Sequence, residues 1–275
     1  FSVCQAVKAN GGKVIVQVDR LVRMPSRPRN TIIPGCLVDA IVVVEPEPRH
    51  AAYEALSGNF EIPYAQWKDW NEMLENLTSS KQLSNAAGRV ISKRASRELK
   101  PDDIVNVGVG IPELVTRYAR KSGILDQITL TVESGGIGGF PASGTVFGAV
   151  IGANCVVDMA NLFDLYDDGG LDVCFMGALE VDRHGNVNAH RGPGSFAGIG
   201  GFANITSKTH TVVFCLTFNA KGLEIKRDND RVDIIQNGSI PKFVEQVRSK
   251  SFSAKRALQN GQRVLYVTER CVFEL

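Results

Sequence analysis

The feature that most constrains this chain is the alternation of short, β-branched apolar runs with segments that carry helix signals. Residues 103–107 (DIVNV) and 128–133 (ITLTVE) are apolar runs of strand length, and the segment between them opens with Pro112 and Glu113 and closes at Gly123. Proline at the first helical position and an acid in the first turn are typical of a helix start. This order predicts βαβ units and an open, mostly parallel α/β sheet flanked by helices on both faces.

The same pattern extends along much of the chain. A helix is predicted from its cap Ser84 to Pro101, because apolar residues recur there at three- and four-residue spacing. Residues 242–247 are assigned to an ordinary amphipathic helix of the scaffold. Further strands are predicted at 152–158 (GANCVVD), 170–177 (GLDVCFMG), 209–218 (THTVVFCLTF) and 263–269 (RVLYVTE).

Three regions follow from these patterns. Residues 1–45 read as helix, strand, loop and strand, and their apolar run 39–45 (DAIVVVE) is typical of a buried parallel strand. Residues 46–82 carry three prolines and both tryptophans without a strand pattern, and we interpret them as a linker. Residues 83–275 form the second, larger domain. Because the chain opens inside a helical pattern without an initiating Met, we expect a fragment or one subunit of a split enzyme.

Composition argues against several classes of function. A net charge of +2 over 275 residues gives no basic footprint for nucleic acid. No apolar run approaches the roughly 20 residues that a membrane span needs, so we expect neither nucleic acid nor a membrane as partner. The cysteines form no CxxC pair, and we interpret them as reduced, buried thiols of a cytoplasmic protein. They are Cys4, Cys36, Cys155, Cys174, Cys215 and Cys271.

A glycine-rich turn, Gly108-Val109-Gly110, lies between a predicted strand and a predicted helix. Backbone N–H groups and a helix N-terminus favour an anion at such a place. The dinucleotide-binding fingerprint fails on spacing, because its third glycine would fall at Glu113, an acid that would repel a pyrophosphate. From this motif alone, binding of an anion or a thioester and a plain tight turn remain open alternatives.

Glu133 ends an apolar strand and is followed by the glycine-rich stretch SGGIGG. In open α/β sheets ligands bind beyond the carboxyl ends of the strands, so we expect Glu133 and Val109 to face one crevice. Four glycines in five residues allow the backbone to approach a ligand closely. The alternative is that Glu133 is a helix-capping or salt-bridged acid.

Two later segments are further candidates for binding. The cluster at 198–202 (GIGGF) offers the backbone N–H groups of Gly200 and Gly201 for an oxyanion hole, with a flexible loop as the alternative. Lys221, in the sequence NAKG, is a candidate for contact with a ligand phosphate, with a solvated turn as the alternative.

Other polar residues give weaker signals. His184 and His190 lie in a polar loop without a Ser or Cys placed to suggest a triad. Asp164, Asp167 and Asp168 lack the pattern of a calcium loop, and we interpret them as the acidic rim of a turn. No metal site is therefore expected.

Several motifs, taken together and in order, resemble the family I coenzyme A transferases. They are VNVGVGIPELV, TVESGGIGGFP, FDLYDDGGLDVCFMGALEVDRHGNVN, GIGGFANIT and KRALQNGQRVLYVTERCVF. The resemblance runs from Leu83 to Leu275 and is greatest to the short-chain acyl (propionate/acetate) branch, while residues 1–45 resemble the end of that family's first domain. It implies the open α/β fold shared by coenzyme A transferases and some sugar-phosphate isomerases.

The resemblance also implies roles for particular residues. Glu133 corresponds to the nucleophile that becomes covalently bound to coenzyme A. Val109 and either Gly200 or Gly201 correspond to the backbone amides around the thioester carbonyl. Some acetate-preferring relatives have Asn where this chain has Gly177, so their acyl preference is not carried over. The residues that the resemblance places at the coenzyme are Gly108, Val109, Gly110, Gly201 and Lys221.

The implied activity is an acyl-CoA:carboxylate CoA-transferase that acts on short-chain acids by a ping-pong mechanism. Coenzyme A and acyl-CoA are then substrates, with no other cofactor, and we expect a homo-oligomer completed by a first domain or partner subunit. A side-chain carboxylate is already ionised at neutral pH, so it needs no His base, but it does need an oxyanion hole and exclusion of water. The alternatives are a related acyl-CoA hydrolase, a non-catalytic CoA-binding subunit and, more distantly, a sugar-phosphate isomerase.

Overall fold

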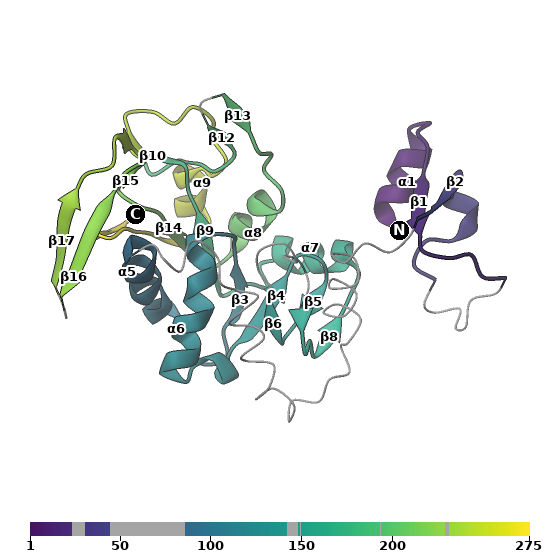
Figure 1. Ribbon diagram of the computed structural model, residues 1–275, viewed down its shortest axis with the longest axis horizontal. Coiled ribbons are helices and arrows are strands. Elements are labelled where there is room, and N and C mark those ends of the chain that lie inside the picture. Colours follow the sequence, from purple (N-terminus) through teal and green to yellow (C-terminus); the bar gives the residue numbers. More distant parts are fainter. Residues whose placement is uncertain (24–30, 45–85, 142–147, 149, 193, 229–230) are drawn as a thin grey trace. The chain divides into compact units, whose positions relative to one another are not determined.

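The computed structural model describes residues 1–23, 31–44, 86–141, 148, 150–192, 194–228 and 231–275 (Figure 1). The chain divides into two compact units, Phe1–Ala55 and Leu56–Leu275. The predicted linker at 46–82 and the predicted cap Ser84 lie outside the described residues. The domain boundaries drawn from the sequence therefore stay predictions.

The smaller unit contains helix α1 (Ser2–Ala9), strand β1 (Ile15–Val18), the 3₁₀ turn η2 (Gly35–Leu37) and strand β2 (Ala40–Val43), in the predicted order. The two strands pair in parallel. The expectation of a buried strand is wrong for β2, whose four residues are all exposed. A continuous apolar run is buried only where a layer covers both faces, and the described residues of this unit supply no such layer to β2.

The larger unit is built on an eight-stranded sheet with the order β21-β20-β14-β9-β3-β4-β5-β8. The central strands, from β20 to β4, are parallel, and antiparallel strands complete both edges. The predicted mostly parallel sheet is thus confirmed. Its strands are β3 (Ile104–Val107), β4 (Thr129–Val132), β5 (Gly136–Ile137), β8 (Cys155–Val156), β9 (Val173–Gly177), β14 (Thr211–Cys215), β20 (Arg263–Val267) and β21 (Val272–Glu274).

Helices cover both faces of this sheet, as predicted (Figure 1). Alternate residues of β14 enter two separate apolar clusters: Phe214 packs in the cluster of α7 and α8, and Val213 packs in that of α5 and α6. Burial of apolar area on both faces, at about 25 cal/mol per Å², is what holds the parallel strands in place. The helices are α5 (Ala86–Ala95), α6 (Leu114–Ser122), α7 (Met159–Asp167), α8 (Phe202–Lys208) and α9 (Ala254–Gln259), with 3₁₀ turns at η4 (Ser96–Glu98), η5 (Ile111–Glu113) and η6 (Leu125–Gln127).

Short strands and hairpins make up the rest of the larger unit. The helix predicted over residues 242–247 is wrong, because Phe243–Val244 (β19) pairs in parallel with Val181 and Asp182. The backbone of this segment bonds to neighbouring strands rather than to itself. The short strands are β6 (Phe140–Pro141), β7 (Val150–Ile151), β10 (Glu180–Asp182), β11 (Val187–Asn188), β12 (Arg191–Gly192), β13 (Ser195–Phe196), β15 (Asn219–Ala220), β16 (Glu224–Asp228), β17 (Arg231–Gln236), β18 (Ile240–Pro241) and β19.

The cysteines only partly follow the prediction. Cys174 and Cys215 are buried free thiols, as expected for residues of central strands, whereas Cys36, Cys155 and Cys271 are exposed. Exposure follows from position, since Cys155 lies in an edge strand and Cys271 in the turn before β21. None of the described helices has the length and apolar character to cross a membrane.

Candidate active site

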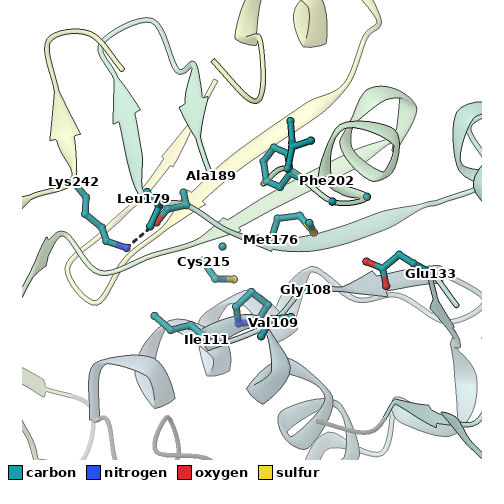
Figure 2. A pocket seen from close by; sticks show the side chains of 16 residues that line it. Gly108, Val109, Ile111, Glu133, Met176, Leu179, Ala189, Phe202, Cys215 and Lys242 are labelled. Carbon is teal, nitrogen blue, oxygen red and sulfur yellow. Dashed lines mark hydrogen bonds between the residues drawn. The ribbon is translucent and has the colours of Figure 1, made fainter. Parts of the chain in front are cut away.

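A cavity of about 470 Å³ opens at the carboxyl ends of the parallel strands (Figure 2). Glu133 follows β4 and Val109 follows β3, and both line this cavity. The expectation that they face one crevice is therefore confirmed. Of the other sequence candidates, the cavity is lined by Gly108, Gly200 and Gly201.

Glu133 is held at the cavity by a tight turn between the antiparallel strands β4 and β5. The N–H of Gly135 donates to the carbonyl oxygen of Val132 at 2.9 Å. Gly135 has φ of +121°, and a Cβ there would lie 1.9 Å from the carbonyl oxygen of Val157. No other residue fits such a place. Glycine is thus sterically required at position 135, and the turn that it allows places Glu133 directly after the end of β4.

The Glu133 carboxyl is half-buried, and burial raises its pKa above the usual value. The backbone N–H of Glu133 and the Asn106 side chain act in the opposite direction and lower that pKa. Asn106 is fully buried in β3, where its Nδ2 donates to the Tyr166 hydroxyl at 3.3 Å. The Tyr166 hydroxyl donates in turn to Thr131 Oγ1 at 3.0 Å. A buried polar network therefore stands behind the carboxylate in an otherwise apolar core.

In the glycine turn after β3, the backbone N–H of the middle residue, Val109, is the one that remains as a candidate donor to a ligand. The N–H of Gly108 donates to the carbonyl oxygen of Phe175 at 2.8 Å, and the N–H of Gly110 donates to Glu113 Oε1 at 2.8 Å. No hydrogen bond from the Val109 N–H is found within the described parts of the chain. Glu113, which stands where the dinucleotide-binding fingerprint has its third glycine, thus accepts the Gly110 N–H. That N–H is therefore not available to a phosphate.

Gly201 approaches Glu133 from the other side of the cavity. A Cβ on Gly201 would lie 2.9 Å from the Phe163 ring and 3.3 Å from Cγ of Glu133. Gly201 has φ of −76°, which any residue adopts, so its lack of a side chain serves close approach rather than backbone conformation. Gly200 is the residue in the left-handed region, with φ of +53°.

Several sequence candidates do not line this cavity. Gly110 is not among the lining residues, and its N–H is engaged by Glu113. Lys221 lies in an exposed turn with φ of +56°, and its role at the coenzyme stays a prediction. The His184 and His190 side chains also lie outside the lining, and His190 Nδ1 is 2.7 Å from Ser251 Oγ.

The acidic cluster of the sequence is not a turn. Asp164 and Asp167 belong to helix α7, and Asp168 caps its end. Asp167 accepts from Asn204 Nδ2 at 2.9 Å, so this acid links α7 to α8. Within the residues that the structure describes, no group of three or more His, Cys, Asp and Glu side chains could hold a metal.

Three residues at or behind the cavity were not predicted from the sequence. Asn106 was read only as part of an apolar strand, although a polar residue inside such a run is itself a signal of a buried network. Lys242 was assigned to an amphipathic helix, and Pro241 directly before it is compatible with a helix start. Cys215 was seen as a core thiol but also lines the cavity; burial raises the pKa of its thiol.

The chain is similar over its whole length to known coenzyme A transferases. The caffeate CoA-transferase of Acetobacterium woodii is 39% identical over 100% of this chain and 52% of its own length. The acetate CoA-transferase YdiF of Escherichia coli (strain K12) is 37% identical over 99% of this chain and 50% of its own length. This chain thus spans about half the length of the curated relatives it matches.

Solved structures agree with these relatives. The apoenzyme of the acyl-CoA transferase YdiF from Escherichia coli O157:H7 matches with a TM-score of 0.78 at 34% identity, covering 99% of this chain and 49% of that one. A thioester complex of the same transferase with CoA matches with the same TM-score, at 33% identity and with the same coverage. The family model described as coenzyme A transferase matches residues 89–217. The fold and these likenesses together show that the chain belongs to the coenzyme A transferase family.

Proposed function

We propose that the protein containing this chain is an acyl-CoA:carboxylate CoA-transferase for short-chain acids, with Glu133 as its nucleophile. One observation carries the proposal: a half-buried carboxylate stands at the carboxyl end of a parallel strand, in a cavity that it shares with Val109, Gly200 and Gly201. Two relatives support it: both are named CoA-transferases, and the name of one of them, acetate CoA-transferase, contains a short-chain acid.

In the first half-reaction, a carboxylate oxygen of Glu133 attacks the acyl-CoA carbonyl and the CoA thiolate leaves, giving a mixed anhydride. The thiolate then attacks the Glu133 carbonyl of the anhydride, and the donor acid leaves as its carboxylate. The product is a glutamyl-CoA thioester. A second carboxylate repeats these steps in reverse order and leaves as the new acyl-CoA. No net proton is gained or lost, so the sequence needs no general base.

Each attack creates a tetrahedral oxyanion that needs hydrogen-bond donors. The Val109 N–H is our candidate on one side, because its two neighbours use their N–H groups within the fold. Gly200 and Gly201 are the candidates on the other side. Burial raises the pKa of Glu133, and a poorly hydrated carboxylate is a stronger nucleophile in such a cavity.

The proposal distinguishes Glu133 from the other nucleophile in the cavity. Cys215 also lines it, but burial raises the pKa of this thiol, so the thiol stays protonated at neutral pH and reacts poorly. We therefore expect CoA to become attached to a carboxylate, not to a thiol.

Trapping the covalent intermediate tests the proposal. The intact protein is incubated with acetyl-CoA without an acceptor acid and then treated with borohydride or hydroxylamine. Borohydride reduces a glutamyl thioester to an alcohol, and hydroxylamine converts it to a hydroxamate. We expect mass spectrometry of the digest to find the changed mass in the peptide spanning Glu133. Glu133→Gln abolishes the adduct, while Glu133→Asp impairs it strongly because the shorter side chain withdraws the carboxylate from its attack position.

Other outcomes of these experiments would contradict the proposal, and each identifies a different alternative. An adduct on Cys215 makes the protein a thiol-dependent acyltransferase, and a fully active Glu133→Gln variant ends the assignment. Steady release of free CoA without dependence on an acceptor acid identifies an acyl-CoA hydrolase. Binding of CoA without any adduct in the intact protein identifies a non-catalytic subunit.

We also propose that residues 1–45 do not form a domain alone but pack onto the larger unit or onto sequence outside this chain. The support is the apolar surface of the small parallel sheet, where Ile41 is 52% and Val43 is 53% exposed. Isolated two-stranded sheets are at best marginally stable. Limited proteolysis that released this segment as a protease-resistant, folded fragment would show the domain assignment to be wrong.

A further inference from the structure

Lys242 is a charged group in the cavity wall that the proposed reaction does not use. Its backbone is fixed on both sides, because Lys242 N–H donates to the Phe218 carbonyl oxygen at 3.2 Å and its carbonyl oxygen accepts from Val181 N–H at 2.8 Å. The side chain is half-buried and lines the same cavity as Glu133. In Figure 2 the two side chains stand at opposite ends of the group of lining residues.

The Lys242 ammonium has only part of its hydrogen-bonding capacity satisfied. Nζ donates to the Ala178 carbonyl oxygen at 2.7 Å, its single hydrogen bond among the residues that the structure describes. An ammonium carries three N–H donors. Burial lowers the pKa of Lys242 to about 8, although the Glu269 charge acts to raise it. A lysine kept in such surroundings without a full set of partners is typical of a binding site.

The charges around Lys242 leave a net positive charge at this end of the cavity. The nearby acid is Glu269, whose side chain is fully buried. Glu269 is already engaged: Oε1 pairs with Arg270 Nε at 3.1 Å, and Oε2 accepts from the Phe218 N–H at 2.9 Å. One carboxylate therefore faces two cations. The group of Lys242, Glu269 and Arg270 carries a net charge of +1, with only Lys242 of the three lining the cavity.

We propose that Lys242 determines acyl specificity by binding a second carboxylate at the far end of the acyl substrate. The reacting carbonyl of that substrate meets Glu133, and its methylene chain lies against apolar lining such as Met176 and Phe202. The inference rests on the proposed function, which places the reacting carbon at Glu133. A dicarboxylic acid then has one carboxylate at each end of the cavity.

The lining beside Lys242 favours a carboxylate over a phosphate. Ala178, Leu179 and Ala189 add no side-chain donors to this end. An ammonium forms charge-assisted hydrogen bonds with a carboxylate as well as with a phosphate, and the apolar side chains beside Lys242 fit the methylene chain of an acyl substrate. A contact with a phosphate of coenzyme A is the competing source of an anion, and the test separates the two.

The test compares acceptor acids that have the same chain length, succinate with butyrate and glutarate with pentanoate. In the wild-type intact protein at pH 7 we expect the dicarboxylate of a pair to have the higher kcat/KM by about tenfold or more, since a hydrogen bond to a charged group contributes this much. Lys242→Met, which keeps the length of the side chain, abolishes the preference, mainly through KM for the dicarboxylate. Lys255→Met is the control, because Lys255 is an exposed lysine of α9 outside the cavity.

The pH dependence of the dicarboxylate preference in the wild-type protein is a second test, which does not depend on whether the variant folds. The preference for the dicarboxylate is present while Lys242 is protonated and declines as pH rises through its pKa. Equal kcat/KM within each pair in the wild type, or an unchanged preference in a folded Lys242→Met variant, overturns the inference. A rise in KM for coenzyme A that is the same for all acids overturns it in favour of a coenzyme contact.

Failure of the inference and failure of the proposed function give different results. Transfer to monocarboxylates with no dicarboxylate preference leaves the transferase assignment intact and removes the role of Lys242. If no acid is an acceptor, the assignment fails, and calorimetric titration with succinate and butyrate still tests the site. Binding of succinate that is tighter than that of butyrate, and that is lost in Lys242→Met, supports the anion site. Equal binding of the two acids overturns it.

Discussion

The two ends of the parallel strands in the larger unit differ in whether their charged side chains are paired with each other. At the amino ends, charges pair with each other: Glu98 accepts from Arg94 at 2.5 Å and from Arg263 at 2.6 Å. At the carboxyl ends, Glu133 and Lys242 line a cavity instead. Burial raises the pKa of Glu133 and lowers the pKa of Lys242, so it favours the neutral form of each side chain.

The comparison indicates that the paired charges at the amino ends of the strands stabilise the fold, whereas the charged groups at the carboxyl ends do not. Burial by itself would raise the pKa of Glu98, but the hydrogen bonds from Arg94 and Arg263 hold it below the usual value. Ionised Glu98 therefore stabilises the fold. Burial dominates at Glu133 and raises its pKa, so ionised Glu133 destabilises the fold. We expect substitutions at the two ends to change different properties.

Glu133→Gln gives the largest expected effect, because transfer activity is lost while stability rises. A raised carboxyl pKa means that the stabilising contribution is present below the unfolded-state pKa, about 4.3, and is lost as pH rises through the folded pKa. The neutral amide avoids this loss. We expect thermal unfolding at pH 8 to give a higher Tm for Glu133→Gln than for wild type, with the difference vanishing below pH 4.

The same carboxyl group also sets a pH limit on turnover in the wild type. Since only the ionised form attacks, kcat/KM falls at acid pH with an apparent pKa above the ordinary value for Glu. A Glu133→Gln variant that is less stable than wild type at pH 8 would contradict the contrast between the two ends of the sheet.

Gly201→Val comes second, with an expected loss of about 10²–10³ in kcat. The added side chain meets the Phe163 ring and Cγ of Glu133, so we expect it to displace both the proposed nucleophile and the neighbouring candidate backbone donor. Steady-state kinetics and circular dichroism on the same preparation separate lost turnover from lost fold. Gly194→Val is the matched control, because a Cβ there has no neighbour within 4 Å, although its φ of +67° adds strain. Wild-type turnover in a folded Gly201→Val variant removes this loop from the site.

Glu98→Gln gives the smallest expected effect, and it falls on stability. Removing one charge from this partly exposed group lowers the free energy of unfolding by about 1 kcal/mol, or roughly 2–4 °C in Tm for a unit of this size. The lowered pKa of Glu98 means that its contribution is present above the unfolded-state pKa and lost as pH falls through the folded pKa. The difference between variant and wild type therefore disappears in acid, and kcat stays within twofold. A large drop in kcat would show that the amino ends also serve the reaction.

The sequence predicted the sheet well because its signals are local. The predicted strand 128–133 contains β4 (Thr129–Val132) and is one residue longer at each end. Helix α6 ends at Ser122 with Gly123 as its cap, φ of +78°, as the glycine indicated. Local patterns did not reveal burial in the smaller unit, where the apolar run of β2 is exposed. Burial depends on a covering layer that a strand's own residues do not encode.

The candidate site was predictable only in part, for a related reason. Glu133 and Val109 carry signals in their own surroundings, a strand end and a glycine turn. Asn106 and Lys242 matter through neighbours that are far away in sequence: Nδ2 of Asn106 reaches Tyr166, and Nζ of Lys242 reaches Ala178. Such pairings arise from the order of strands in the sheet, which no single window of sequence contains.

The hydrogen bond from Gly110 to Glu113 limits which backbone donors the turn can offer to a ligand. A glycine turn before a helix ordinarily offers its N–H groups to an anion. Here a side chain of the protein already fills that position, at 2.8 Å from the Gly110 nitrogen. Because Glu113 already uses the Gly110 N–H, the turn lies against the cavity with the Val109 N–H as its free backbone donor among the residues that the structure describes.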